Sequence, residues 1–498
     1  MLAASNSAPV DAAEAGYDPL PVDSALRILR FNPIPASSDI EVIHRDIKIG
    51  EDRVSDIQAK IYEMGGLLQR LNLAQQHLLA YIDLQQKTFA NIRRLPDEIL
   101  RNIFSFCADP LALALAKHPV WRLAQVCGRW RDIIIDSPSL WSAINVDQLS
   151  LGRHPKRIEH ACKLLQLYFA RSKTHPLTIR CFRFRKLDPA IAEILVSSSE
   201  RWQDLFIYGY NGCNDRSLDG IKGRIPQLRR LHTHQCTFSS EVNLFETAPS
   251  LTSLKLDEIS FEQPDTFPAF PYSQLTHVTL KTPMTFSAFR ELSQSMTQAY
   301  FLDISLLLIV DDIEDGRLIL PTVRELAIGS HPQPEILPYL DVPHLDRVCL
   351  YLGNSTDEAD ILEIKQFLQH PSFHASTFNL LGTPNLETAL SILKAAPGIQ
   401  NLHLGMEEDL IRDPIICSLT SGLIPNLSTL TLERVWRFDL GPITELLESK
   451  IGVSRLKFMY TLGLEDEYSW ELEDLCSFAK ERGVELDVGW TYVLEDSH

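Results

Sequence analysis

The chain has 498 residues, of which 45% are hydrophobic and 22% charged, with a formal net charge of −18 at pH 7. This length allows several domains or one elongated repeat domain, and the negative charge argues against a general nucleic-acid-binding protein. Residues 305–310, the most apolar run, are too few to span a bilayer, and residues 1–15 lack the apolar core of a secretory signal. We therefore expect a cytoplasmic or nuclear protein that is neither secreted nor bound to a membrane.

The cysteines and the short motifs give no indication of chemistry. The nine cysteines are odd in number and scattered, without a Cys-x-x-Cys pair, as expected for reduced thiols rather than a disulfide framework or zinc site. The sequence contains no phosphate-binding glycine loop, zinc-protease motif or nucleophile elbow. We expect no catalytic residue, cofactor or metal site. The alternative is an enzyme within an α/β domain, which a deep polar pocket with perturbed titratable groups would support.

The N-terminal part predicts a tail followed by one long helix. Residues 1–49 begin with a stretch rich in Ala, Ser, Pro and Asp, which predicts a flexible tail. In residues 50–92, twelve positions from Val54 to Ile92 are separated alternately by three and four residues, and ten of them are apolar, which is a coiled-coil pattern. Gly65 and Gly66 weaken this helix by about 1 kcal/mol each. The apolar seam could pair two chains or fold back onto the segment that follows, and the sequence leaves both open.

Residues 93–146 predict short amphipathic helices. Pro96, Asp97 and Glu98 suit a helix start. The backbone N–H that proline lacks has no partner in the first turn of a helix, and acidic side chains there are stabilised by the positive end of the helix dipole. A second helix is predicted from Trp121 to Ile135, where Asp-Ser-Pro ends it. A segment of this length buries little apolar surface by itself. It therefore needs a partner or a neighbouring domain.

The same segment carries, in order, Leu-Pro-Asp-Glu-Ile-Leu, Ile-Phe, Val-Cys-x-x-Trp-Arg and Pro-x-Leu-Trp. This set resembles the F-box, an all-α module. The resemblance implies binding to the Skp-type adaptor and, through it, to the cullin of an SCF-type ubiquitin ligase. Carried over to matching positions, the candidate adaptor-binding residues are Leu95, Pro96, Ile99, Leu100, Ile103, Val126, Cys127 and Trp130. Trp130 could equally belong to the core of the module.

One feature departs from compact F-boxes. The segment 107–120, between the two predicted helices, is longer than in those modules. With Arg-Arg-Leu-Pro before it and Pro-x-Leu-Trp after it, this expanded form is similar to the large F-box families of mushroom-forming fungi.

Residues 147–498 contain an internal repeat. Each copy has an apolar residue, a Leu three positions later and a Leu, Ile or Val two positions after that, and a Pro often stands two positions before the first. Copies start at positions 174, 202, 228, 251, 275, 299, 323, 345, 375, 399, 427, 453 and 483, with spacings from 22 to 30 residues. The pattern resembles leucine-rich repeats, in which each copy gives one strand of a parallel stack and the connection crosses back as a helix. The predicted fold is therefore α/β: a leucine-rich-repeat-like solenoid of parallel strands plus helices, preceded by an all-α F-box and a long N-terminal helix.

Charge is unevenly distributed along this repeat region. Residues 151–240 carry 16 Lys and Arg against 7 Asp and Glu, whereas residues 301–498 carry 13 against 33. In such a solenoid, the residues between the leucines face the concave surface, and at the basic end these are Arg229, Arg230, His232 and His234, with Lys255 and Lys281 on the next two strands. Guanidinium groups bind phosphate through paired hydrogen bonds, so these residues are candidates for binding an acidic or phosphorylated target. The alternative is a solvated strand face that balances the acidic half. His232 and His234 lack a third ligand, so no metal site is predicted.

Together these features predict a substrate-recognition subunit of an SCF-type E3 ubiquitin ligase. The F-box would dock the Skp-type adaptor, and the repeat domain would bind an unidentified target protein. The helix 50–92 could add self-association, and no nucleic acid or membrane partner is expected. The alternative function is a non-ligase repeat scaffold for protein–protein assembly, which the absence of a co-purifying cullin would favour.

Overall fold

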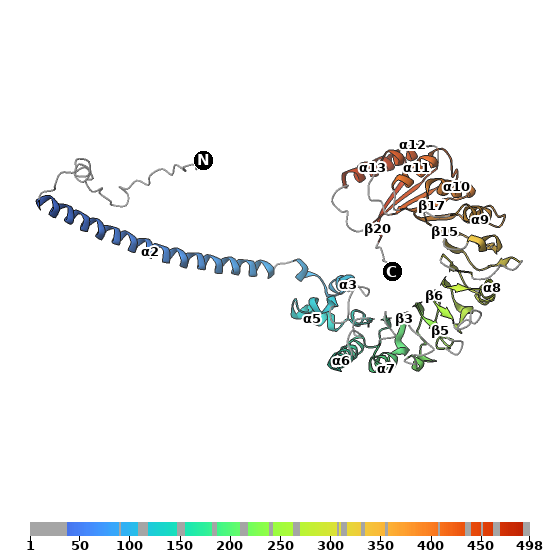
Figure 1. Ribbon diagram of the computed structural model, residues 1–498, viewed down its shortest axis with the longest axis horizontal. Coiled ribbons are helices and arrows are strands. Elements are labelled where there is room, and N and C mark those ends of the chain that lie inside the picture. The colour runs from blue at the N-terminus through green and yellow to red at the C-terminus, as the bar shows by residue number, and fades with distance from the viewer. Residues whose placement is uncertain are drawn as a thin grey trace. The chain divides into compact units, whose positions relative to one another are not determined.

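The computed structural model (Figure 1) is described for most of the chain beyond residue 36. The described ranges are 37–88, 91–107, 118–146, 155–181, 187–209, 218–238, 243–261, 269–305, 308–309, 316–329, 334–353, 357–406, 409–433, 440–449, 452–461 and 469–491. The chain divides into two units, Met1–Pro96 and Asp97–His498, and each is described by itself.

The first unit contains the 52-residue helix α2 (Ser37–Thr88) and the short 3-10 helix η1 (Asn91–Arg94). Helix α2 begins at Ser37 rather than at residue 50, because Ile40, Ile43 and Ile47 extend the alternate spacing of three and four towards the N-terminus. Residues 37–49, which the sequence assigned to the tail, are thus helical, and residues 1–36 lie outside the described residues. From Glu51 to Lys87 every side chain of α2 is exposed. Among the described residues, no helix combines the length and the apolar character needed to cross a bilayer.

The second unit begins with three short helices. These are α3 (Asp97–Cys107), α4 (Pro119–Leu123) and α5 (Gly128–Ile135), followed by the 3-10 helix η3 (Pro138–Trp141). The single helix predicted over 121–135 is therefore wrong. Cys127 is extended, with φ −159° and ψ 171°, and this conformation separates α4 from α5. Most of the long segment 107–120 lies outside the described residues.

The rest of the second unit is built on one long parallel sheet, which has 14 strands within the described residues. The strand β1 (Ala143–Asn145) comes first, and each predicted copy then contributes one strand. These thirteen strands are β2 (Leu177–Cys181), β3 (Trp202–Tyr208), β4 (Arg230–His234), β6 (Ser253–Asp257), β8 (His277–Lys281), β10 (Phe301–Asp303), β13 (Glu325–Gly329), β15 (Arg347–Leu352), β16 (Thr377–Gly382), β17 (Asn401–Met406), β18 (Thr429–Glu433), β19 (Arg455–Thr461) and β20 (Glu485–Thr491). The predicted fold class is confirmed. The predicted domain boundary at residue 146 falls after β1, so the first strand of the sheet precedes the first predicted copy.

Helices connect most of the strands and lie on the outer side of the curve that the sheet follows within this unit (Figure 1). They are α6 (Pro155–Ser172), α7 (Pro189–Ser197), α8 (Phe286–Ser295), α9 (Glu358–Leu368), α10 (Leu386–Ala395), α11 (Asp409–Thr420), α12 (Leu440–Glu448) and α13 (Ser469–Glu481). Shorter connections use the 3-10 helices η6 (Ser199–Arg201), η7 (Asp219–Ile221), η8 (Tyr272–Gln274) and η9 (Pro334–Tyr339). Three small parallel pairs complete the described elements: β5 (Thr237–Phe238) with β7 (Ser260–Phe261), β9 (Pro283–Met284) with β11 (Leu308–Ile309), and β12 (Leu318–Ile319) with β14 (Leu340–Asp341).

The core lies between the sheet and the outer layer. Alternate strand residues such as Leu254 and Leu256 are buried, and the residues between them face the inner side of the curve. The first predicted copy was placed in the wrong register. Ile179 and Cys181, rather than Leu177 and Ile179, pair with the buried residues Leu205 and Ile207 of β3, and the register is irregular between Leu177 and Thr178. The displacement is by two residues, so Leu177 and Ile179 remain on the buried face and each residue moves to the next row across the sheet.

Candidate functional site

An aromatic cluster joins the short helices to the repeat sheet. Trp141 is fully buried, with its ring centroid 5.3 Å from that of Trp121 and 5.1 Å from that of Tyr168 on α6. Its indole Nε1 donates to the carbonyl oxygen of Ile134 (2.8 Å), and the guanidinium of Arg171 lies 4.3 Å from its ring centroid. Strand β1 follows two residues later and pairs with β2. The short helices and the first repeat therefore share one core.

Two further contacts hold the short helices together. The guanidinium of Arg129, on α5, forms an ion pair with Asp97, at the start of α3, with Nη2 2.5 Å and Nε 2.9 Å from Oδ1. The rings of Phe104 on α3 and Trp130 on α5 lie 4.8 Å apart. The N-terminal ends of α3 and α5 therefore lie close together.

The predicted adaptor-binding residues divide into buried and accessible positions. Leu100 is fully buried and contributes to the core, so it offers no surface to a partner. Ile99 is 44% exposed and Val126 60% exposed, and both flank the Asp97–Arg129 ion pair in sequence. The half-buried positions are Ile103, Cys127 and Trp130.

The other two predicted residues, Leu95 and Pro96, end the first unit immediately before α3. Leu95 is half-buried and Pro96 exposed.

One accessible apolar residue was not among the predicted candidates. Phe106 is 87% exposed and stands three positions after Ile103, which itself stands four positions after Ile99. Spacings of four and three place these side chains on one face of α3. That spacing was available in the sequence, and it would have added Phe106 to the candidates.

The family comparison agrees with this module. Residues 92–147 match the family model described as F-box-like. This range holds α3, α4, α5, η3 and β1. Residues 92–147 form an F-box-like domain. F-box domains bind Skp-type adaptors. Among the described residues of this F-box-like domain, the exposed large apolar side chains are Ile92, Ile99, Phe106, Val126 and Ile135. A comparison with curated proteins finds no match to the chain.

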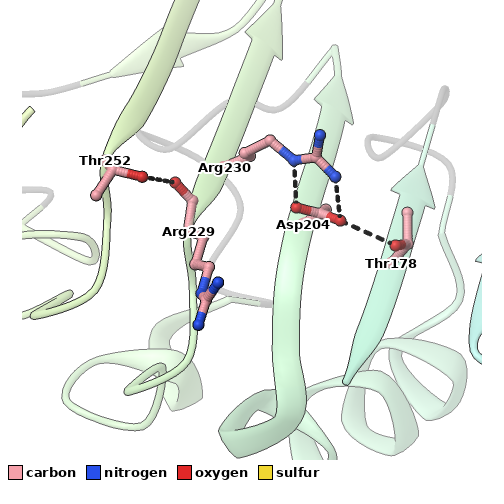
Figure 2. A network of polar contacts seen from close by, with 5 residues as sticks. All are labelled: Thr178, Asp204, Arg229, Arg230 and Thr252. Carbon is pink, nitrogen blue, oxygen red and sulfur yellow. Dashed lines mark hydrogen bonds and ion pairs between the residues drawn. The ribbon is translucent and has the colours of Figure 1, made fainter. Parts of the chain in front are cut away.

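The second candidate surface is the inner face of strands β2 to β6. Arg230, on β4, forms a two-pronged ion pair with Asp204 on β3, with Nε 2.6 Å from Oδ1 and Nη2 2.8 Å from Oδ2 (Figure 2). Thr178, on β2, donates to the same carboxylate at 3.1 Å. Asp204 is almost fully buried, and its hydrogen bonds raise the pKa of the Arg230 guanidinium further above its already high value. Arg230 is therefore held by its own sheet.

Arg229 has a different environment from its neighbour. Its backbone N–H donates to the Gln203 carbonyl (2.8 Å), and its own carbonyl accepts from the N–H of Thr252 (3.0 Å). Figure 2 shows its side chain directed away from Asp204, on the other side of the chain from that of Arg230. The two arginines therefore differ in environment, although both were predicted as candidates for binding an acidic or phosphorylated target.

The two predicted histidines lie beside aromatic side chains, and His234 also lies beside a carboxylate. The ring of His232 is 5.9 Å from Phe206 and 5.5 Å from Tyr208, and that of His234 is 5.3 Å from Tyr208. His234 Nδ1 also lies 3.4 Å from the carboxylate of Asp257.

Strand register places two more basic residues in the same row. Arg180, Phe206, His232 and Lys255 occupy matching positions on β2, β3, β4 and β6. The Arg180 guanidinium lies 4.6 Å from the Phe206 ring centroid, which is a cation–π contact. We call Arg180, Phe206, Tyr208, His232, His234 and Lys255 the concave patch. The predicted register would have aligned Arg180 with Tyr208 and His234, whereas the observed register aligns it with Phe206 and His232.

The strand face at the acidic end is internally paired. Arg455 on β19 contacts Glu485 and Asp487 on β20 at 3.4 and 3.6 Å, and Lys457 contacts Asp487 at 3.1 Å. Basic residues on β19 therefore neutralise much of the acidic charge on the inner face of β20. The described residues contain no group of three or more His, Cys, Asp or Glu side chains placed to hold a metal ion.

Proposed function

We propose that this protein is the substrate-recognition subunit of an SCF-type ubiquitin ligase. The F-box-like domain at residues 92–147, which shares a core with the repeat sheet through Trp141, carries the proposal. The chain itself is non-catalytic. It recruits a cullin through the adaptor and holds a target near the enzyme that carries ubiquitin, so its contribution to the reaction is proximity.

The proposed adaptor-docking face consists of accessible apolar residues. In the second unit these are Ile99, Ile103, Phe106, Val126 and Cys127. Exposed apolar side chains gathered on one small helical module are typical of a protein-binding surface, since water otherwise hydrates them unfavourably. The shared core with the repeats supports a fixed geometry between the adaptor and the bound target.

The proposed target-binding face is the concave patch. Arg180 and Lys255 supply positive charge, and the rings of Phe206, Tyr208 and His232 supply a flat surface beside it. This combination suits an acidic or phosphorylated segment, because charge-assisted hydrogen bonds to an anion are stronger where aromatic groups exclude water.

Adaptor binding is the first experiment. The full-length protein is expected to capture a purified Skp-type adaptor and, with it, a cullin. The double variant Leu95→Ala/Pro96→Ala should abolish that capture while the repeat domain stays folded by circular dichroism. Capture that survives in this variant would place the docking face elsewhere, and adaptor capture without a cullin would favour the non-ligase scaffold.

A matched pair on α3 sharpens this experiment. Phe106→Asp places a charge in the proposed face and should weaken adaptor binding by at least about 30-fold, or about 2 kcal/mol. Ser105→Asp adds the same charge one position earlier and should bind normally. Equal losses in both variants would indicate a general effect on α3 rather than a contact.

Target binding is tested with labelled phosphoserine peptides and their unphosphorylated forms. Lys255→Glu should weaken phosphopeptide binding by about 10-fold at low salt, and the difference should shrink as salt screens the charge. The control is Lys394→Glu, on the outer helix α10, where the side chain is exposed, whereas that of Lys255 is half-buried. If Lys255→Glu and Lys394→Glu bind equally, the inner face of these strands is only a solvated surface.

A further inference from the structure

Helix α2 presents an apolar seam along one side. At 1.5 Å per residue its 52 residues extend about 78 Å. From Ile40 to Gln85, fourteen positions alternate by three and four, and eleven are apolar. The apolar seam positions are Ile40, Ile43, Ile47, Val54, Ile57, Ile61, Met64, Leu68, Leu71, Leu78 and Ile82. All but Ile43, which is half-buried, are 42–63% exposed, an arrangement that favours association in water.

We infer that α2 binds a second copy of this chain as a parallel, in-register, two-stranded coiled coil. In the heptad, Ile40 begins the positions named a, and five of the seven a positions are Ile or Val. The d positions are Ile43, Gly50, Ile57, Met64, Leu71, Leu78 and Gln85. Branched residues at a favour two strands where d is leucine and more strands where d is isoleucine, so the polar positions carry the two-stranded assignment. A second copy supplies an identical seam, so the interface is self-complementary.

The polar seam positions determine the register. In the parallel dimer Gln75 meets Gln75 of the second copy and Gln85 meets Gln85, and each amide can both donate and accept. In the antiparallel register that fully overlaps the helices, Gln75 would face Gly50 and Gln85 would face Ile40. That arrangement buries amides without partners, which is unfavourable. The in-register parallel pairing is therefore preferred.

The two glycines leave the seam intact. Gly65 and Gly66 directly follow the seam residue Met64 and fall at the e and f positions of the heptad. A Cβ added at either would meet no atom within 4 Å. They lower the intrinsic helix stability without removing a seam contact.

Parallel pairing has a functional consequence. Helix α2 ends at Thr88 and the F-box-like domain begins at residue 92, so two F-box-like domains would follow from the same end of the coiled coil. A dimer would offer two adaptor-docking faces and two concave patches. A target with two binding segments would then be held more tightly than by one chain, because the second contact forms within the complex.

The molar mass of the full-length protein tests the pairing. Sedimentation equilibrium at micromolar concentration should give twice the chain mass of 56.4 kDa. Leu71→Asp should weaken dimerisation by at least about 100-fold, because two carboxylates would share one buried layer. Leu73→Asp, at the outward f position, is the matched control and should remain dimeric. A monomeric native chain would overturn the proposal and favour α2 docking on its own chain, and a trimer or tetramer would overturn the two-stranded pairing.

Direction is tested by cross-linking. Val54→Cys should form a disulfide-linked dimer under mild oxidation only if the helices are parallel and in register. In the fully overlapped antiparallel register residue 54 faces residue 71, so Val54→Cys alone would not cross-link. The unmodified chain shows how much cross-linking the native cysteines give. Leu73→Cys shows how much an added cysteine on the outward face of α2 gives. A Val54→Cys chain that dimerises by mass but cross-links no faster than these controls would overturn the parallel assignment.

Discussion

Trp141→Ala is expected to destabilise the junction between the F-box-like domain and the repeat sheet by about 3–5 kcal/mol. The side chain is fully buried against Trp121 and Tyr168, and its removal leaves a cavity in the core that the two parts share. The variant also loses the hydrogen bond to the Ile134 carbonyl and the cation–π contact with Arg171. The link between the F-box-like domain and the repeat sheet should loosen as a result.

Hydrogen–deuterium exchange on the full-length protein measures this effect locally. Amides of α6 and of β1 should exchange at least about 100-fold faster in Trp141→Ala, because local opening becomes easier. Trp141→Phe is the matched control, since it keeps a ring in the core and loses the Nε1 donor, for a cost of about 1–2 kcal/mol. Unchanged exchange in α6 of the alanine variant would show that the junction does not depend on Trp141.

Arg230→Ala is expected to lower the free energy of unfolding by about 2–3 kcal/mol, and Arg229→Ala by less than about 0.5 kcal/mol. The difference arises because removing Arg230 takes two hydrogen bonds from the buried Asp204 carboxylate and leaves, among the described residues, the bond from Thr178. The Arg229 side chain takes no part in this network (Figure 2). Adjacent arginines thus provide a test and its control on the same strand segment.

Chemical denaturation measures the free energy of unfolding of Arg229→Ala and Arg230→Ala. Amide exchange in β3 and β4 then shows whether the loss of stability is local to these strands. The double variant Asp204→Ala/Arg230→Ala should recover part of the stability lost in Arg230→Ala, because no unpaired buried charge remains. Equal stability of Arg229→Ala and Arg230→Ala would contradict the assigned ion pair. Loss of target binding on reversing Arg230 would be ambiguous, since that change also disrupts the sheet, so Lys255 and Arg229 are the better probes.

The periodic features were accessible from sequence because they are local. The spacing of three and four in α2 continues from Ile40 to Gln85, and the repeat of one strand every 22 to 30 residues fixed the position of thirteen strands. Both patterns follow from which side chains must leave water, and neighbouring residues show this directly. The order of short motifs in residues 92–147 is likewise local, and these residues match the F-box-like family model.

Other features depended on strand register and on contacts between distant segments. Cys127 in an extended conformation divided the helix predicted over 121–135, and the register of β2 against β3 placed Arg180 beside Phe206. Sequence spacing could not reveal either one, because each depends on how the chain packs around it.

The sequence by itself determined the class of fold, the F-box-like module and the apolar seam of α2, since each rests on a repeated local pattern. Only the tertiary structure decided which charges are available for binding. Arg229 and Arg230 are neighbours in sequence, yet Arg230 is held by Asp204, which is 26 residues earlier and lies on the adjacent strand. In a parallel stack each strand's neighbours are one repeat away, so the partner of a side chain is fixed by register across the sheet rather than by adjacency along the chain.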